Sequence, residues 1–289
     1  MNISIVIIAF KSEHVLDKLI ESIPSTYEIL VIENSLNNEI KKNLEKKFSN
    51  LKVFIPKENL GYSAGVNLGI QNSTNNFVFI LTPDVIIKKN VLQSFEKLLE
   101  TFDSFSLLAP VYENTSVHKN FKIFQKGDTE QLLINSFKLK EVDEIDGACF
   151  LINKREFQHY NIMDENFFLY FDSTDLCHKL KKENKKMYIV SNLRFNHEGT
   201  ASSKEEFKFE ILLNRNWHYS WSKFYFYKKN VNYLHALKKV SPNLLKALIN
   251  FFYFKIIFDN KKASLNKAIL SGIFNSILLR KSSYRPKIK

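Results

Sequence analysis

The chain opens with Ile3-Ser4-Ile5-Val6-Ile7-Ile8-Ala9-Phe10, a run in which Ser4 is the one polar residue. A continuous apolar run of this length predicts a strand that is buried on both faces. Strand-like and helix-like segments alternate after it, and this βαβαβαβ order indicates an α/β fold with a mainly parallel sheet covered by helices on both faces. The expected strands are 3–10, 28–32, 52–55 and 77–81, and the expected helices are 13–23, 39–48 and 63–71.

Three strand ends carry the first candidate binding residues, because ligands of parallel α/β sheets bind beyond the carboxyl ends of the strands. These residues are Ala9, the pair Glu33 and Asn34, and Asp84 after Thr82-Pro83. The Glu33 carboxylate can accept hydrogen bonds from a ribose or a base, although a polar strand end or a helix N-cap explains it equally well. Asp84 can hold a Mg²⁺ or Mn²⁺ ion that bridges a diphosphate, with a turn residue as the alternative.

The segment from Asn59 to Gly69 holds three of the seven glycines, at Gly61, Gly65 and Gly69. Residues four apart share one face of a helix, so these glycines allow the backbone to approach a sheet or a nucleotide closely. The segment matches neither the P-loop nor the glycine fingerprint of dinucleotide-binding folds. Kinase, NTPase and dehydrogenase functions are therefore disfavoured.

Aromatic residues surround two carboxylates in the stretch from Asp164 to Cys177 (DENFFLYFDSTDLC). On a helix that begins near residue 171, Asp172 and Asp175 share one face. Carboxylates beside an apolar wall suit a general base or a divalent cation, because burial and mutual repulsion shift their pKa values. An acidic first turn, which the helix dipole favours, is the alternative. His197 follows at the end of a strand-like segment and is either a structural histidine or a further metal ligand.

The pattern after residue 100 is less regular. The stretch 114–141 has poor periodicity and is expected to be irregular or lid-like. From Lys204 onward the apolar spacing is continuously helical, with breaks expected at Pro242 and at Asp259-Asn260. Between these segments we expect a strand over 144–152, a helix over 172–183 and a strand over 187–190.

The C-terminal region, expected over 204–289 beside an α/β domain over 1–203, carries the positive charge of the chain. From Ala201 onward 18 Lys and Arg residues face 4 Asp and Glu residues, in a chain with a net charge of +12. A basic segment rich in aromatic residues indicates an anionic partner, either a membrane surface or nucleic acid. Its aromatic side chains suit a bilayer interface, with helices packed on the first domain as the alternative. They form two groups, the first with Trp217, Tyr219, Trp221, Phe224, Tyr225 and Tyr227 and the second with Phe251, Phe252, Tyr253 and Phe254.

The features that bear on location indicate the cytoplasm. The apolar run 3–10 is too short for a secretory signal, and no basic residue precedes it. The most apolar tail segment, 243–258, is interrupted by Lys246 and Lys255, so it suits a position on a membrane better than a path across one. The two cysteines form neither a metal-type pair nor a disulfide framework, which fits a reducing compartment. We therefore expect a cytoplasmic protein that is peripheral on the inner face of the cytoplasmic membrane.

These segments occur together in the order and spacing of one enzyme family. The chain resembles the family 2 inverting glycosyltransferases of the GT-A fold, particularly the rhamnosyltransferase-like enzymes of bacterial surface polysaccharides. The resemblance is close over about residues 1–200 and loose beyond them. The segments that carry it are Ile5–Phe10, Ile32–Ser35, Asn59–Gly69, Leu81–Asp84, Asp146–Ala148, Phe167–Cys177 and His197. Each motif alone is weak, but their shared register is a specific signal.

The resemblance implies a nucleotide-sugar donor carrying UDP, dTDP or GDP, and an acceptor hydroxyl on a glycan or a lipid-linked molecule. It implies nucleoside contacts at Glu33 and Asn67, and a Mg²⁺ or Mn²⁺ ion on the diphosphate held by Asp84 and His197. Arg215 is the candidate cation that assists the departing diphosphate. Further donor contacts are implied for Ala9, Asn34, Asn59, Gly61 and Asp146.

The sequence departs from the family pattern at the catalytic base. An inverting transfer needs a base that takes the proton of the acceptor hydroxyl during in-line attack at the anomeric carbon. The family commonly has an acidic pair here, whose second acid is often the base, but in this chain Asp172 is followed by Ser173. A serine cannot act as a general base near neutral pH, so we take Asp172 as the base, with Asp175 as the alternative. Thr82 stands where the family usually has Asn, a change expected to matter less.

The sequence therefore favours a glycosyltransferase that builds lipopolysaccharide, capsule or a related glycan. Two other functions stay open. One is a catalytically inactive homologue that acts as a binding subunit, an alternative that Ser173 supports. The other is a nucleic-acid-binding protein that uses the basic tail. The tail carries no recognised DNA- or RNA-binding signature, so no nucleic-acid partner is expected.

Overall fold

The computed structural model describes residues 3–113, 119–124, 131–197 and 204–286. The chain forms two compact units. The first unit comprises Met1–Leu60, Ala64–Asp164 and Ser173–Lys204, and the second comprises Gly61–Ser63, Glu165–Asp172 and Glu205–Lys289. A division into domains at 203/204 stays a prediction.

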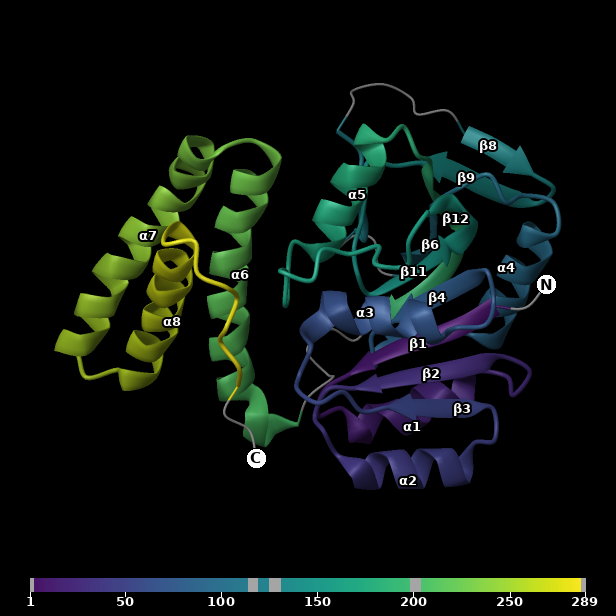
Figure 1. The fold of residues 1–289 in the computed structure, drawn as a ribbon, viewed down its shortest axis with the longest axis horizontal. Coiled ribbons are helices and arrows are strands. Elements are labelled where there is room, and N and C mark those ends of the chain that lie inside the picture. The colour runs from purple at the N-terminus through teal and green to yellow at the C-terminus, as the bar shows by residue number, and fades with distance from the viewer. Residues whose placement is uncertain (1–2, 114–118, 125–130, 198–203, 287–289) are drawn as a thin grey trace. The chain divides into compact units, whose positions relative to one another are not determined.

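A large sheet forms the centre of the first unit (Figure 1). The strands are β1 (Ile3–Ala9), β2 (Glu28–Glu33), β3 (Leu51–Phe54), β4 (Phe77–Leu81), β5 (Val85–Ile86), β6 (Leu107–Tyr112), β7 (Phe121–Lys122), β8 (Gln131–Ile134), β9 (Phe137–Glu141), β10 (Glu144–Ile145), β11 (Cys149–Asn153) and β12 (Met187–His197). The helices up to residue 204 are α1 (Glu13–Ser22), α2 (Asn38–Lys47), α3 (Gly61–Asn72), α4 (Lys89–Leu99), the short 3₁₀ helix η1 (Lys154–Glu156) and α5 (Asp172–Lys182). Among the described residues the strand order is β3-β2-β1-β4-β11-β6-β12-β9-β8, with β5 paired to β12, and β7 pairs separately with β10.

The first four strands of this order are parallel, as the alternating sequence pattern predicts. Strand β1 lies between β2 and β4, and all of its residues are buried. Its Ile3, Ile5 and Ile7 pack in one core with α1. On the other face, Val6 and Ile8 contact the glycines of α3. The predicted α/β sheet with helices on both faces is therefore confirmed, and its second half mixes parallel and antiparallel pairs.

Three expectations for the second half of the chain are wrong in part. The stretch 114–141 is not irregular throughout, because β8 and β9 form a hairpin in which Phe137 and Leu139 are buried and Lys138 is exposed. Residues 114–118 and 125–130 of that stretch lie outside the described part of the chain. The strand expected over 144–152 is interrupted, since Asp146 Oδ1 accepts a hydrogen bond from the Ala148 amide at 3.1 Å and forms a tight turn. Strand β12 continues past Val190 to His197, because after a bulge it pairs again with β6 and with β5.

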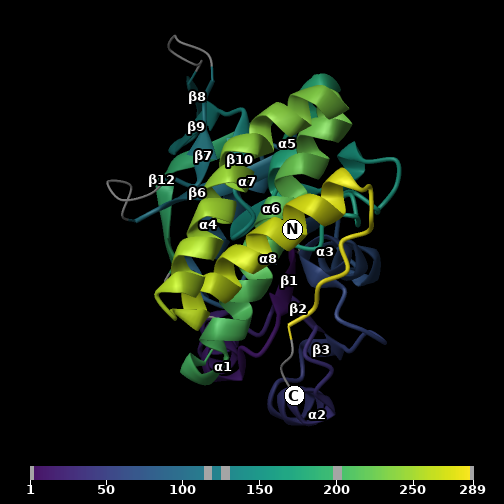
Figure 2. The same ribbon diagram turned by 90° about the vertical axis from the view of Figure 1, so that its left-hand side faces the viewer.

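The second unit is mainly helical, as predicted from Lys204 onward. A 3₁₀ turn, η2 (Glu205–Phe207), leads into α6 (Lys208–Asn230), α7 (Tyr233–Ile256) and α8 (Asn260–Ile277), which lie side by side (Figures 1 and 2). The break at Asp259 is confirmed: its side chain accepts a hydrogen bond from the Lys262 amide at 3.0 Å and caps α8. The break expected at Pro242 is wrong. Proline leaves the Lys238 carbonyl without its usual amide donor, and the Ser241 hydroxyl donates to that carbonyl at 3.1 Å instead.

The two aromatic groups of the tail differ in burial. In the first group Trp217, Trp221 and Phe224 are buried within the helices of the second unit, so their role is in packing. In the second group Phe252 and Tyr253 are more than half exposed. Within the part of the chain that the structure describes, no helix is long and apolar enough to span a bilayer.

Candidate active site

The carboxyl ends of β1 and β2 bring several predicted residues of the first unit together. The Asn34 amide donates to the Ala9 carbonyl at 2.9 Å, so the two strand ends are adjacent. The side-chain oxygen of Asn34 accepts a hydrogen bond from the Leu60 amide at 3.1 Å, which fixes the chain next to half-buried Asn59. Parallel pairing of the strands thus places Ala9, Asn34 and the start of the glycine segment at one edge of the sheet.

Glu33 lies at the same edge and is fully buried. One carboxylate oxygen accepts a hydrogen bond from the Ser35 amide at 2.6 Å, while Oε2 is buried and has no hydrogen-bond partner among the described residues. Burial raises the pKa of Glu33, and the hydrogen bonds from Ser35 offset part of that rise. A buried acceptor without a donor is costly, so Oε2 suits a ligand that brings an N–H or O–H group.

Asn67 and Gly69 have packing roles in the first unit. The Asn67 side chain donates to the Met163 carbonyl at 2.9 Å and accepts from the Met163 amide at 3.0 Å. A Cβ atom on Gly69 would lie 2.2 Å from Val6 Cγ1, so α3 packs closely on β1. Of the two alternatives for the glycine stripe, the structure therefore provides the close approach to the sheet. A nucleoside contact by Asn67 stays a prediction.

Asp84 and His197 form the pair that the sequence indicated. Asp84 follows β4 and precedes β5, and pairing of β5 with the end of β12 brings His197 beside it. His197 Nε2 lies 3.2 Å from Asp84 Oδ1. Burial alone would raise the pKa of Asp84, but the hydrogen bond and charge of His197, with hydrogen bonds from Thr82 and the backbone, lower it. The same contact raises the pKa of His197 against the opposing effect of burial.

Tyr112, at the end of β6, joins this pair to Asp146. Its hydroxyl donates to Asp146 Oδ2 at 2.7 Å and lies 3.1 Å from His197 Nδ1. A carboxylate can only accept, so the single hydroxyl proton points to Asp146 and the tyrosine oxygen accepts from Nδ1–H of His197. Sequence reasoning missed Tyr112. The signal available in the sequence was its position at the end of the apolar run Leu107–Tyr112.

The Asp84–His197 pair fits a divalent cation. Its donor atoms are 3.2 Å apart, close to the ~3.0 Å between neighbouring ligands of an octahedral ion with bonds of about 2.1 Å. The lowered pKa keeps Asp84 ionised, and the contact from Tyr112 holds the other imidazole nitrogen, as partners of metal-binding histidines commonly do. Across the described ranges no cluster of three or more His, Cys, Asp or Glu side chains could hold a metal ion. A Mg²⁺ or Mn²⁺ site at this pair stays a prediction.

In the second unit, Gly61 packs against the aromatic segment that precedes α5. Gly61 has a φ of 75°, in the left-handed region that favours glycine, and a Cβ atom there would lie 2.4 Å from the Phe168 carbonyl oxygen. The Tyr62 amide donates to the same carbonyl at 2.7 Å. Gly61 is thus required for packing, and its predicted contact with the donor is untested.

Asp172 is the first residue of α5 and is buried. The two residues before it, Tyr170 and Phe171, have φ values of 67° and 60°, which non-glycine residues rarely adopt. Helix α6 supports them: Arg215 Nε donates to the Tyr170 hydroxyl, and the Ser222 hydroxyl donates to the Leu169 carbonyl at 2.9 Å. Strain of this kind marks a position that the surrounding structure fixes, here the one that precedes the predicted base.

Asp175 belongs to the first unit and is also buried. It lies one turn after Asp172 on α5, as the sequence spacing requires. Arg215, predicted to assist the diphosphate, contacts Tyr170 within the second unit. The structure thus brings together Asp84, His197 and Asp146 in one unit, and Asp172 with the Arg215–Tyr170 pair in the other.

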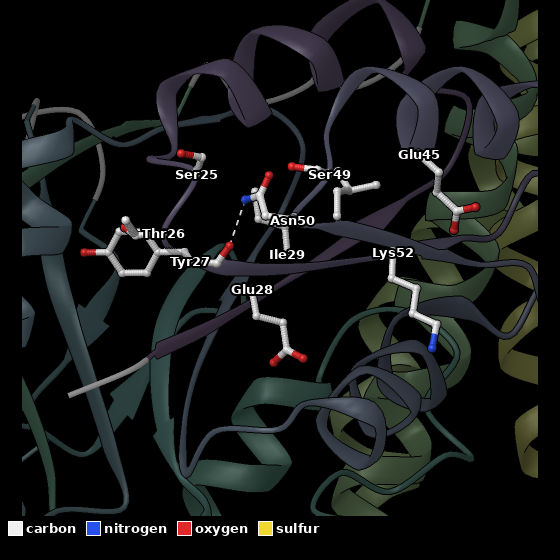
Figure 3. A pocket seen from close by; sticks show the side chains of 10 residues that line it. Ser25, Thr26, Tyr27, Glu28, Ile29, Glu45, Ser49, Asn50 and Lys52 are labelled. Carbon is white, nitrogen blue, oxygen red and sulfur yellow. Dashed lines mark hydrogen bonds between the residues drawn. The ribbon is translucent and has the colours of Figure 1, made fainter.

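A cavity of about 580 Å³ lies elsewhere on the first unit (Figure 3). It is lined by residues at the amino ends of β2 and β3, among them Glu28 and Lys52, and within it the Asn50 side chain donates to the Tyr27 carbonyl at 2.8 Å. The predicted donor-binding residues Ala9, Glu33 and Asn34 lie at the carboxyl ends of β1 and β2, at the other end of these strands. This cavity is therefore separate from the candidate active site.

The sequence profile of the family described as Glycosyl transferase family 2 matches residues 4–160. A curated relative, the low-salt glycan biosynthesis hexosyltransferase Agl10 of Haloferax volcanii, is 26% identical over 195 residues. That match covers 63% of this chain and 62% of the relative, so the chain spans less than two thirds of the relative's length.

Two solved structures share the fold. The mannosyltransferase PcManGT of Pyrobaculum calidifontis, in complex with GDP-Man and Mn²⁺, superposes with a TM-score of 0.56 at 8% identity, over 97% of this chain and 88% of that chain. S. aureus TarS 1–349 in complex with UDP gives a TM-score of 0.50 at 16% identity, over 99% of this chain and 93% of that chain. At these identities the likeness shows the fold alone.

Proposed function

Because the chain belongs to glycosyl transferase family 2, we propose that it transfers a sugar from a nucleotide-sugar donor to a hydroxyl of a glycan or lipid-linked acceptor. The observation that carries this proposal is the Asp84–His197 pair, with donor atoms 3.2 Å apart. The same unit contains buried Glu33, whose Oε1 accepts a hydrogen bond while Oε2 has no partner among the described residues. A cation site and a nucleoside-binding acceptor in one unit are what a nucleotide sugar requires.

The donor would bind with its nucleoside at Glu33. The unpaired Oε2 can accept a hydrogen bond from a base N–H or a ribose hydroxyl, and that bond would remove the cost of burying it. Asn34 and the neighbouring backbone would define the edge of this pocket. The two structures that share the fold contain GDP-Man and UDP. We propose UDP, dTDP or GDP as the nucleotide of this donor.

The diphosphate would bind at Asp84 and His197, which together would hold a Mg²⁺ or Mn²⁺ ion. When bound, that ion supplies positive charge that stabilises the departing diphosphate. His197 must present a neutral Nε2 to act as a ligand, and Tyr112 keeps the proton on Nδ1. Asp146 in turn holds the Tyr112 hydroxyl in place.

For the chemical step we propose an inverting transfer with Asp172 as the general base. A base in an in-line displacement takes the acceptor proton on the face opposite the leaving group. Asp172 is buried at the first position of α5, and strained neighbours held by α6 fix its backbone. Asp175, one turn later, is the second candidate, since Ser173 cannot replace the family's second acid.

We further propose that the acceptor belongs to a cell-surface polysaccharide such as lipopolysaccharide or capsule. Rhamnose is one candidate sugar, and the hexosyltransferase relative supports a hexose as another. Activity on lipid-linked acceptors suits a protein on the inner face of the cytoplasmic membrane. The net charge of +12, concentrated in the tail, supports such a position because inner leaflets are anionic.

A thermal-shift experiment tests the donor site. The full chain is melted with UDP, dTDP, GDP or CDP, each with and without Mn²⁺. A ligand that binds only the folded protein at about 100 times its Kd stabilises it by about 2.7 kcal/mol, which raises the melting temperature by several degrees. We expect one diphosphate to do so in the presence of Mn²⁺, and Asp84→Ala to abolish the shift.

The matched control is Asp103→Ala, which removes an exposed carboxylate of the same unit and should leave the shift intact. If no nucleotide stabilises the wild-type protein, the proposed activity is wrong and an inactive binding homologue becomes the better account. If Asp84→Ala responds as the wild type does, the cation site has been placed on the wrong residues.

A further inference from the structure

Helix α7 exposes a row of large apolar side chains that none of the proposed chemistry uses. They define the α7 face: Leu245, Leu248, Ile249, Phe252, Tyr253 and Ile256, each between 41% and 74% exposed. The turn after the helix extends this face with Phe258, which is 86% exposed. Exposed apolar residues scattered singly are ordinary, but a continuous row on one element marks an interaction surface.

The α7 face is opposite the side of the helix that packs within the second unit. Ala236, Val240 and Ala247 are buried there, and the first two pack with α6 and α8 residues. At roughly 100° per residue, the six side chains of the α7 face cover an arc of about 140°. From Leu245 to Ile256, helix α7 is therefore apolar both inward and outward, whereas an outer side that meets only water is polar.

Lysines border this arc. On the same helical projection Lys246 lies at one edge and Lys255 at the other, and both are exposed. Lys261 and Lys262 lie in the first turn of α8, and Lys262 Nζ lies 5.2 Å from the centre of the Phe254 ring. The last acidic residue of the sequence, Asp259, caps α8 and pairs with Lys262 at 3.2 Å, so positive charge dominates around the turn between α7 and α8.

We propose that the α7 face docks on an anionic lipid bilayer, with the apolar row in the interface and the lysines at the headgroups. Long lysine side chains can extend to headgroups while their stems cover apolar surface, and aromatic residues favour the same zone. A second copy of the chain fits less well, because a symmetric contact through this face would bring like-charged lysine borders together. The inference deepens the membrane association proposed above and rests on it: the docked face would keep the enzyme at lipid-linked acceptors.

Vesicle sedimentation of the full-length protein tests this assignment. The vesicles contain phosphatidylcholine alone or phosphatidylcholine mixed with phosphatidylglycerol. We expect binding to the anionic vesicles that weakens with salt. The double variant Phe252→Glu/Ile256→Glu should bind at least tenfold more weakly. Lys255→Gln/Lys261→Gln should lose about fivefold per lysine on the anionic vesicles.

The matched control is Phe124→Glu/Leu133→Glu, which makes the same kind of change at two exposed apolar residues of the first unit. It should bind as the wild type does. Equal binding of wild type and the α7 double variant would overturn the proposal. So would light scattering that shows a wild-type dimer and a monomeric α7 variant, or salt-sensitive binding to RNA with none to vesicles.

The nucleotide thermal shift, measured on the same proteins, separates this inference from the proposed function. We expect the α7 variant to keep its response to the nucleotide, since neither residue belongs to the donor site. Vesicle binding without any nucleotide response would contradict the enzymatic proposal alone. A nucleotide response without vesicle binding would contradict the α7 assignment alone.

Discussion

The Tyr112 hydroxyl lies 3.1 Å from Nδ1 of His197, and its proton is directed to Asp146 at 2.7 Å. This geometry fixes the orientation of the imidazole and leaves Nε2 facing Asp84. The ring of Tyr112 also packs on Phe195, with centroids 4.8 Å apart, so the side chain is held by packing as well as by hydrogen bonds. Tyr112 is therefore a positioning residue for the proposed cation site.

Replacing Tyr112 by Phe tests that role. The ring packing would remain, but His197 would lose the acceptor that keeps the proton on Nδ1. We expect the Mn²⁺ affinity, read from Mn²⁺ titrations of the nucleotide thermal shift, to fall by about 10- to 100-fold. Tyr27→Phe is the matched control, because it removes a buried hydroxyl at the amino end of β2. Unchanged Mn²⁺ affinity in Tyr112→Phe would remove Tyr112 from the site.

Gly61 and Gly65 should respond differently to alanine. A Cβ atom at Gly61 would lie 2.4 Å from the Phe168 carbonyl and would force an alanine into a φ of 75°. At Gly65 the nearest atom, Ile8 Cγ2, would lie farther away, at 3.3 Å, and the φ of Gly65 is not in the left-handed region. We expect Gly61→Ala to lower the free energy of unfolding by at least about 1 kcal/mol and Gly65→Ala by less, in urea titrations. Equal effects would mean that the close approach of Gly61 to Phe168 is not a constraint.

The assignment of the catalytic base is tested by Asp172→Asn and Asp175→Asn. Each change keeps the shape of the side chain and removes its basicity. A general base contributes about 10²- to 10⁴-fold, so we expect kcat for donor turnover to fall within that range in Asp172→Asn and by tenfold or less in Asp175→Asn. Both variants should retain the nucleotide thermal shift. The reverse order of effects would assign the base to Asp175.

Buried His218 should make stability depend on pH. Its Nε2 contacts the Tyr284 carbonyl at 2.9 Å and its Nδ1 contacts the Ser282 hydroxyl at 2.9 Å, so the neutral ring is satisfied on both sides. Burial lowers the pKa of His218 to about 3. Between about pH 6.5 and pH 3 the unfolded chain therefore binds a proton that the folded chain does not. The contribution of neutral His218 to the free energy of unfolding is therefore complete above about pH 6.5 and decreases as the pH drops below that value.

Urea unfolding at pH 7 and pH 5 measures this effect. We expect the free energy of unfolding to decrease by up to about 1.4 kcal/mol per pH unit from this one group. His218→Gln should show a smaller decrease, while His14→Gln, at an exposed histidine, should match the wild type. If His218→Gln retains the full pH dependence, the loss of stability comes from other groups.

The sequence predicts the first half of the fold well, because its signals are local. Strands β1 and β4 are uninterrupted apolar runs, and pattern alone identifies them. The helix break predicted at Pro242 was wrong. The Ser241 hydroxyl donates to the Lys238 carbonyl in place of the missing amide of Pro242, a contact that the presence of a proline does not predict. The pairing of β8 with β9 was missed because it depends on a partner strand rather than on a strong local pattern.

Local sequence signals likewise identified only part of the candidate site. Asp84 follows the apolar strand β4 and His197 ends β12, and both were found from these positions. Tyr112 was not, because its function arises from contacts with residues 34 and 85 positions away in the sequence. Trp217 and Phe252 look alike as aromatic residues of a basic tail, and burial alone separates the packed residue from the exposed one.

The most direct test of the central claim is the release of nucleoside diphosphate from UDP-, dTDP- and GDP-sugars with Mn²⁺, measured for the wild type, Asp84→Ala and Asp172→Asn. The account predicts that the wild type turns over one class of donor, with water as a slow acceptor, and that each variant loses at least about 100-fold of that rate. Asp172→Asn should still bind the nucleotide, whereas Asp84→Ala should not. Equal rates in all three proteins, or no turnover of any donor by the wild type, would contradict it.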